Sequence, residues 1–250
     1  MKKLKLLSFL LIISTILKAD CGPILSFFPF RKTIKQNAIF MVESSNHGYW
    51  GLLDSFNIKY PIYLKSGNDS VKLVVFEKKK GQKGLIQVLL KPTELLKAGK
   101  VYEIIIGNYP ANEFWGDNKV RPLKKWKVKR GKDEIAPIFK ETPKVMGRVA
   151  IEFGCGDVVI VNFKIKVKDK SEHLVKTTVL DLKTGKSSDY YYLTSKKNVV
   201  DVGEYMCEGA FYLTYKGDYQ ATFSLIDACG NENLTDIKVI QFKGPGHYSE

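Results

Sequence analysis

The stretch YQATFSLIDACGN occupies residues 219–231 and joins two different patterns. Every second residue from Tyr219 to Leu225 is apolar, which is the period of a strand with one buried face. The residues that follow, Asp227-Ala-Cys-Gly-Asn231, bring together groups that suit a metal site, a catalytic site or a tight turn. Whether this stretch is a site or a turn bears on both the fold and the chemistry of the chain.

The turn is the interpretation we adopt. Asp227 is expected to accept hydrogen bonds from loop N–H groups, as in Asx turns, and Asn231 to tolerate an unusual φ or to cap the turn. Gly230 would supply a left-handed position. The alternative is a calcium site, but calcium takes about six to eight oxygens, several of them from carboxylates. That site would use Asp227, Asn231, Asn233 and Asp236, which offer two carboxylates unless Glu232 joins them.

Strand-like runs follow one another at short spacing from residue 38 to residue 242. Many short strands separated by turn signals predict an all-β sandwich or barrel. The expected strands are residues 38–44, 60–65, 71–77, 85–90, 101–108, 124–130, 158–167, 173–182, 189–194, 210–215, 219–227 and 236–242. The polar stretch 130–143 contains Gly131, Pro137 and Pro143, so it is expected to hold a linker between two halves.

Each half carries the same short motif. The first half has Leu96 and Gly99 before Tyr102, and the second has Leu213 and Gly217 before Tyr219. A leucine, a glycine turn and a tyrosine that opens a strand are typical of the tyrosine corner in Ig-like sandwiches.

These motifs carry a family resemblance. LKAGKVYEIII resembles the L-x-x-G-x-x-Y corner of bacterial Ig-like domains in surface and secreted proteins, and YQATFSLIDACGN is similar to their strand F with its D-x-x-G-N turn. EFGCGD and MCEGAF add to a likeness with exported proteins that end in an Ig-like module. The resemblance implies two tandem Ig-like β-sandwich domains, at residues 20–130 and 138–243, with a linker at 131–137 and a tail at 244–250. It implies no activity.

The N-terminus predicts export. Three lysines near the start precede an apolar run of twelve residues from Leu6 to Leu17, shorter than the ~20 residues of a spanning helix. We predict a signal peptide over residues 1–19 and a periplasmic, cell-surface or extracellular protein without a transmembrane segment. Lipidation of Cys21 is the alternative, although Lys18 and Asp20 depart from a lipobox.

The charge favours anionic partners. The net charge is +14, and loss of the four leader lysines leaves 14 − 4 = +10. A basic exported protein is attracted to cell-wall polymers, lipopolysaccharide or lipid headgroups. Nucleic acid is the less favoured partner. The run RPLKKWKVKRGK (121–132) surrounds Trp126 with cations, which could bind a polyanion or sugar, but alternation makes it an ordinary strand with a wet face. EKKKGQKG (77–84) is expected to be a hairpin tip.

The sequence contains no recognised catalytic motif. G-x-S-x-G, H-E-x-x-H and glycine-rich phosphate loops are all absent, and the three histidines are widely spaced. We therefore predict no catalytic residues, no metal and no cofactor. The favoured function is a non-enzymatic exported protein that binds an envelope polymer or protein. The alternatives are a two-domain periplasmic chaperone and a hydrolase with an unrecognised site.

The candidate binding surface is a pair of aromatic loops. Tyr49 and Trp50 lie in one, and Phe114 and Trp115 in the other, each beside Asn or Asp. Loops of a sandwich are where binding residues gather. The competing interpretation is that these rings plug the ends of the sandwich or pack against the second domain.

The resemblance also implies a disulfide between Cys155 and Cys207. In an Ig-like sheet strands B and E are antiparallel neighbours, so the start of B lies opposite the end of E. If strand E begins only at Ala210, Cys229 becomes the better partner of Cys207.

Overall fold

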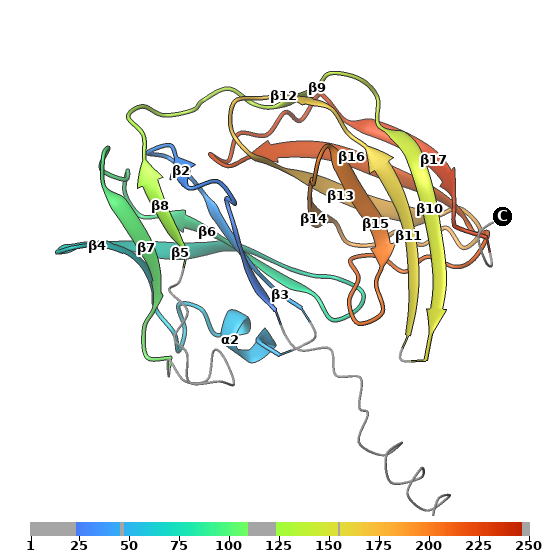
Figure 1. The fold of residues 1–250 in the computed structure, drawn as a ribbon, viewed down its shortest axis with the longest axis horizontal. Helices are drawn as coiled ribbons and strands as arrows, with labels where there is room; N and C mark the ends of the chain where they lie inside the picture. The colour runs from blue at the N-terminus through green and yellow to red at the C-terminus, as the bar shows by residue number, and fades with distance from the viewer. Residues whose placement is uncertain (1–23, 46–47, 110–123, 155, 247–250) are drawn as a thin grey trace, which may run out of the picture.

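A computed structural model describes residues 24–45, 48–109, 124–154 and 156–246. The expected signal peptide, Cys21, Phe114, Trp115 and Cys155 lie outside the described residues. Within them the chain is almost entirely β, as predicted, with one short helix, α2 (Trp50–Asp54). Figure 1 shows two β halves side by side, the first coloured blue to green and the second yellow to red.

The first half is one sheet that doubles over into a sandwich. Its spatial order is β1 (Leu25–Phe28), β3 (Phe40–Ser44), β6 (Ile86–Pro92), β5 (Asp69–Lys80), β4 (Ile62–Ser66), β7 (Val101–Ile106), β8 (Lys125–Val128) and β2 (Thr33–Ile34).

The sheet bends back on itself along β5, because the first residues of this strand pair with β4 and its later residues pair with β6. The two pairings meet at Leu73, and a β-bulge between Val75 and Glu77, within the pairing with β6, adds to the bend of the strand. The rings of Phe40 in β3 and Trp126 in β8 are therefore only 4.9 Å apart, although these strands are far apart in the sheet order.

The N-terminal segment forms two short strands, β1 and β2, one in each layer of the sandwich. β1 pairs antiparallel with β3, whereas β2 pairs in parallel with β8. With this division the half has the strand arrangement of an Ig-like sandwich, in which both layers face one core. Neither β1 nor β2 was among the predicted strands.

The second half is also an Ig-like sandwich. One layer contains β10 (Lys144–Phe153), β11 (Gly156–Lys164) and β15 (Val199–Glu204), and the other contains β14 (Tyr191–Thr194), β13 (His173–Asp181), β16 (Asp218–Asp227) and β17 (Lys238–Lys243). Phe163 of β11 meets Phe223 of β16 across the core at a centroid distance of 5.1 Å. A small pair, β9 (Ile138–Phe139) with β12 (Val167–Lys168), lies beside them.

One predicted strand was wrong. Residues 210–215 form no strand. The strand that pairs with β11 at this edge of the sheet is instead β15, which ends before Cys207. Phe211 and Leu213 are buried while Tyr212 is exposed, so the alternation is real, but it arises from core packing without sheet pairing. Burial of every second residue therefore does not by itself establish a ladder.

Both tyrosine corners make the upstream backbone hydrogen bond. The Tyr219 hydroxyl accepts from Thr214 N–H at 2.7 Å and lies 2.9 Å from the Thr214 hydroxyl. The Tyr102 hydroxyl accepts from Lys97 N–H at the longer distance of 3.4 Å. Each ring is buried, so each half fixes its own bend in the same way.

The Tyr219→Phe substitution should therefore cost more stability than Tyr102→Phe. Phenylalanine keeps each ring in place and removes only the hydroxyl. We expect a loss of about 1–2 kcal/mol at position 219, where a short bond is broken, and about 0.5 kcal/mol at position 102. Urea denaturation of both variants gives the comparison. An equal or larger loss for Tyr102→Phe would contradict it.

The two halves share an apolar interface. The run IQVLL in β6 is buried at every position, because one face of β6 looks into its own sandwich and the other looks toward the second half. The cluster between the halves comprises Phe28, Ile39, Met41, Leu89, Leu174, Tyr192, Ile226 and Ala228.

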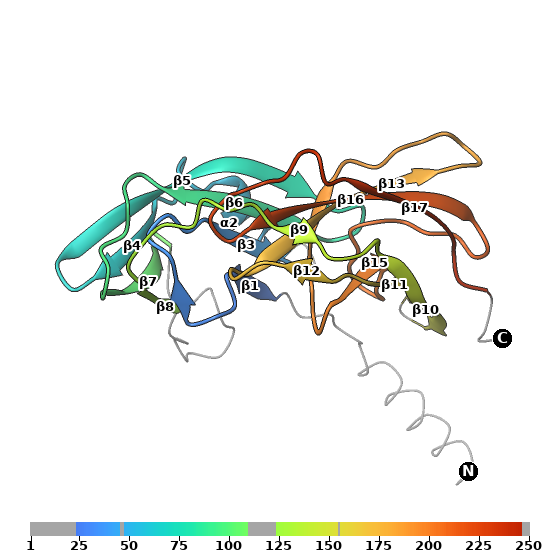
Figure 2. The ribbon, with the colours of Figure 1, turned by 90° about the horizontal axis from the view of Figure 1, so that it is seen from above.

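Polar bonds add to this contact. The buried Gln87 side chain pairs with the backbone of Tyr192, donating to its carbonyl at 2.6 Å and accepting from its N–H at 3.2 Å. The tip of the β5–β6 hairpin docks too, because Lys83 and Gly209 exchange backbone hydrogen bonds of 3.0 and 2.7 Å. Figure 2 shows β5 running toward the second half. The predicted hairpin tip is thus part of the contact between the halves.

Candidate functional site

The segment Asp227-Ala-Cys-Gly-Asn231 is a turn built around one carboxylate. Asp227 Oδ1 accepts from the backbone N–H groups of Cys229 and Asn231, both at 2.8 Å, and Oδ2 accepts from Asn231 Nδ2 at 2.8 Å. Gly230 has φ +84°, a left-handed position that suits glycine. These are the contacts that the turn interpretation requires.

The same turn also joins the two halves. Ile39 N–H donates to the carbonyl of Ala228 at 2.8 Å. Asn231 Nδ2 donates to the carbonyl of Asp133 at 2.9 Å. Asn37 Nδ2 donates to the same carbonyl at 2.7 Å, and Asn37 Oδ1 accepts from Asp133 N–H at 3.0 Å. The strand-free stretch 129–137 is therefore clamped at Asp133 from both halves.

The residues of the calcium alternative have other partners. Asp236 accepts from Phe139 N–H at 2.6 Å and pairs with Lys238 at 2.7 Å. Asn233 accepts from both the backbone and the hydroxyl of Thr235. With the Asp227 carboxylate occupied inside its turn, each of these side chains already makes structural hydrogen bonds, locally for Asn233 and to the distant Phe139 for Asp236.

A second acidic group lies around Cys229. Side-chain ligand atoms of Asp133, Asp227 and Cys229 lie within 4.8 Å of one another. Burial, together with the nearby carboxylates of Asp227 and Asp133, raises the pKa of the Cys229 thiol to about 12. Burial also raises the pKa of Asp227. Cys229 is a free thiol, and its raised pKa disfavours the thiolate that acts as a nucleophile.

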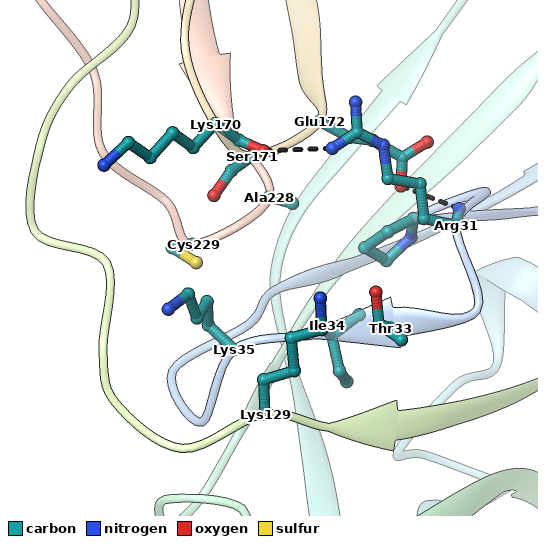
Figure 3. A pocket seen from close by; sticks show the side chains of 11 residues that line it. Arg31, Thr33, Ile34, Lys35, Lys129, Lys170, Ser171, Glu172, Ala228 and Cys229 are labelled. Carbon is teal, nitrogen blue, oxygen red and sulfur yellow. Dashed lines mark hydrogen bonds between the residues drawn. The ribbon is translucent and has the colours of Figure 1, made fainter.

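On the other side of Cys229 lies a small basic pocket. We call it the joint pocket, a cavity of about 100 Å³ between the halves. It is lined by Pro29, Arg31, Thr33, Ile34, Lys35, Lys129, Lys170, Ser171, Glu172, Ala228 and Cys229. Residues 29–35 and Lys129 come from the first half and its exit, and the others from two loops of the second half (Figure 3).

Arg31 fixes the upper rim of the joint pocket. Its backbone N–H donates to Glu172 Oε2 at 2.8 Å, and its guanidinium Nη1 donates to the carbonyl of Lys170 at 2.9 Å. In Figure 3 the amine of Lys129 points up into the space below Arg31, with the thiol of Cys229 on one side and the hydroxyl of Thr33 on the other. Two cations from different segments thus face one small volume.

The cations around this pocket outnumber the carboxylates. Arg31, Lys35, Lys129 and Lys170 carry four positive charges against one negative charge on Glu172, so the lining sums to 4 − 1 = +3. None of these four cations takes part in a salt bridge with another described residue. Cations that outnumber the carboxylates in one cleft favour an anion in it.

The first of the two aromatic loops fits the packing interpretation better than the binding one. Tyr49 is 8% exposed and belongs to the core of the first sandwich. Trp50 starts helix α2, packs against that core and donates through Nε1 to the carbonyl of Gly84 at 3.4 Å. Phe114 and Trp115, the other two predicted binding residues, lie outside the described residues. That the four side chains form one binding surface stays a prediction.

Sequence reasoning missed the joint pocket. The nearest signal is FRKTIK at residues 30–35, which contains three cations and no acidic residue. Lys129 and Lys170 could not be connected with this segment from the sequence, because they are about 100 and 140 residues away.

The structure describes only one of the two cysteines of the predicted disulfide. Cys207 is disulfide-bonded, and Cys155 lies outside the described residues. The start of β11 lies opposite the end of β15, as the prediction assumed. A Cβ on Gly156 would lie 2.5 Å from the carbonyl oxygen of Met206, so the chain neighbours of the two cysteines touch. The Cys155–Cys207 pair remains a prediction.

Comparisons with known proteins do not identify this chain. Neither a protein-family model nor a curated protein matches it. It has 10% identity over 90% of its length to pullulanase type I from Bacillus subtilis str. 168, with a TM-score of 0.25. It has 8% identity over 90% of its length to the tandem Ig repeats of Dlar, covering 95% of that chain, with a TM-score of 0.22.

The chain spans only 25% of the pullulanase chain. Likenesses this weak carry no argument about function. Among the described residues no helix has the length and apolar character needed to cross a membrane.

Proposed function

We propose that this protein is an exported, non-enzymatic interaction protein of the bacterial cell envelope, and that it binds phosphate or carboxylate groups of an envelope polymer in the joint pocket. The observation that supports this is a cavity between two docked sandwiches that is lined by four cations, none of them in a salt bridge with another described residue, of which Arg31 and Lys129 face its interior. The basic net charge of the chain acts in the same direction.

The chemistry of the lining suits an oxyanion. The guanidinium of Arg31 still has N–H groups beyond the one bonded to Lys170, and guanidinium groups match the oxygens of phosphate and carboxylate. Lys129 adds a point charge, and the Thr33 hydroxyl adds a neutral donor. The cavity has room for a single acidic group, so a longer ligand would extend over the lysines at its rim.

The docking of the halves prepares this site in advance. Arg31 and Glu172 come from different halves, and the bonds between their loops hold the pocket open in one geometry. A ligand that meets fixed donors loses less free energy to ordering than one that must assemble them.

A chaperone that accepts a strand at β8 receives less support. β8 is paired with β7 on one side and with β2 on the other, so its edge is already covered. Addition of a partner strand there would first have to displace β2.

The test is a calorimetric titration with linear inorganic polyphosphate at low ionic strength. We expect the Arg31→Ala/Lys129→Ala double variant to bind at least tenfold more weakly than the unchanged protein, because two charge-assisted contacts are lost. The matched control is Lys72→Ala/Lys91→Ala, which removes the same charge from exposed strand positions and should change affinity by less than about twofold.

Three results would count against this proposal. Equal losses in both double variants would mean that binding follows net charge and not the pocket. No loss in Arg31→Ala/Lys129→Ala would place binding elsewhere. Release of orthophosphate during the titration would indicate turnover, and the non-enzymatic part of the proposal would then be wrong.

A further inference from the structure

Strand β10 forms an edge of the second sandwich. It is the terminal strand of the order β10-β11-β15 and runs for ten residues. Within the part of the chain that the structure describes, no backbone hydrogen bond links its outer side to another segment. Figure 1 shows β10 at the margin of the yellow layer. A long edge of this kind is a template for another strand unless the protein blunts it.

Only one end of β10 is blunted. A β-bulge interrupts its pairing with β11 between Val145 and Gly147, and from Gly147 to Phe153 the ladder is regular. In this regular segment Ile151 is 44% exposed and Phe153 is 45% exposed. The segment carries no lysine and no proline, two residues that often protect an edge, and its charged residues are Arg148 and Glu152, which have opposite signs.

The two faces of this segment differ in chemistry. Arg148 and Ala150 lie opposite Val161 and Val159 of β11, on the core side of the sheet. Glu152 shares that side by alternation. The other side carries Gly147, Val149, Ile151 and Phe153.

We propose that β10 pairs antiparallel with β10 of a second copy of this chain, about a two-fold axis at Ala150. Arg148 then lies opposite the partner's Glu152, and the symmetry makes this pair twice. Val149 lies opposite the partner's Ile151, and Gly147 opposite the partner's Phe153, while the two small Ala150 residues meet at the axis. Direct cross-strand pairs of opposite charge and of β-branched residues are the contacts that stabilise antiparallel sheets.

The neighbouring registers lose this complementarity. With the axis at Val149, Arg148 lies opposite Ala150 and Glu152 opposite Met146 in the bulge. With the axis at Ile151, Glu152 lies opposite Ala150 and Arg148 opposite Gly154. An axis at Arg148 sets the two arginines against each other. Ala150 is thus the position that matches both charged residues in the regular segment, and it yields one six-stranded sheet across the two copies.

A charge-swap series tests this pairing. Sedimentation equilibrium or light scattering after gel filtration, from about 5 to 100 µM protein, should show a dimer for the unchanged chain. Arg148→Glu and Glu152→Arg should each weaken dimerisation at least tenfold, because like charges then face each other twice. The double variant Arg148→Glu/Glu152→Arg should recover it to within about threefold.

Glu152→Arg keeps the bond from Arg148 Nε to the carbonyl of Lys243, so it separates pairing from any local loss of stability. Circular dichroism verifies that each variant is folded. A monomer at 100 µM for the unchanged chain would overturn the proposal. A dimer whose dissociation constant is the same in the unchanged chain and in all three variants would also overturn the proposal, because it would have to form through another surface.

Discussion

Replacement of Trp126 by alanine is expected to lower the free energy of unfolding by about 4 kcal/mol, as large-to-small changes of buried aromatic residues do. The Trp126 side chain is fully buried, and its Nε1 donates to the carbonyl of Pro29 at 2.9 Å. Its ring contacts Phe40 from the opposite layer of the first sandwich. The substitution therefore removes a ring that holds the two layers together and leaves the Pro29 carbonyl unpaired.

Urea denaturation followed by circular dichroism measures this loss. The control is Lys127→Ala, one position along the same strand, where the side chain is exposed and the expected change is within about 0.5 kcal/mol. A loss below about 1 kcal/mol for Trp126→Ala would contradict the core role. It would revive the interpretation of RPLKKWKVKRGK as a binding surface with an aromatic ring at its centre.

Replacement of Gln87 by alanine is expected to cost about 3 kcal/mol and to loosen the two halves from each other. The change leaves the N–H and carbonyl of Tyr192 without their side-chain partner, and each unpaired buried group costs about 1–3 kcal/mol. It also removes the 2.6 Å bond that Gln87 donates to the Glu43 carboxylate. Burial already raises the pKa of Glu43, and the Gln87 bond partly opposes that rise.

Thermal unfolding by calorimetry gives the measurement for Gln87→Ala. The unchanged chain should unfold in one transition, because the halves share an apolar cluster and the Gln87 contacts. In the variant the transition should shift to lower temperature and broaden or divide. Gln241→Ala, an exposed glutamine of β17, is the matched control and should leave the curve unchanged. An unshifted transition for Gln87→Ala would mean that the polar contacts do not couple the halves.

The fold was largely predictable because its signals are local. Alternation from Tyr219 to Leu225 predicted β16, and the burial of every second residue there agrees. The Leu-Gly-Tyr spacing predicted two corners whose hydroxyl bonds are both present. Each of these patterns needs only neighbours within one turn or one strand.

Elements that depend on distant partners were not predictable in this way. β2 has only two residues and exists because β8 lies beside it. Gln87 looks like a polar interruption in an apolar run until Tyr192, 105 residues away, supplies its backbone partner. The same holds for the candidate site, because Arg31 and Lys129 are far apart in the sequence and come to face one cavity only in the folded protein.

The aromatic loop illustrates a different limit. Composition shows that Tyr49 and Trp50 are apolar for a loop, but both a binding patch and a core plug produce that composition. Tyr49 packs in the core because the loop folds into α2, whose Leu52 and Leu53 enter the same cluster. Nothing within the loop itself distinguishes these outcomes.

The joint pocket is most directly tested by an NMR titration of the ¹⁵N-labelled chain with linear inorganic polyphosphate. The proposal predicts that backbone amides of residues 31–35, 170–172 and 228–229 shift together, with one common dissociation constant, because these segments from both halves line one cavity. Shifts confined to residues 77–84 or to the outer faces of single strands, with residues 31–35 and 170–172 unchanged, would contradict it.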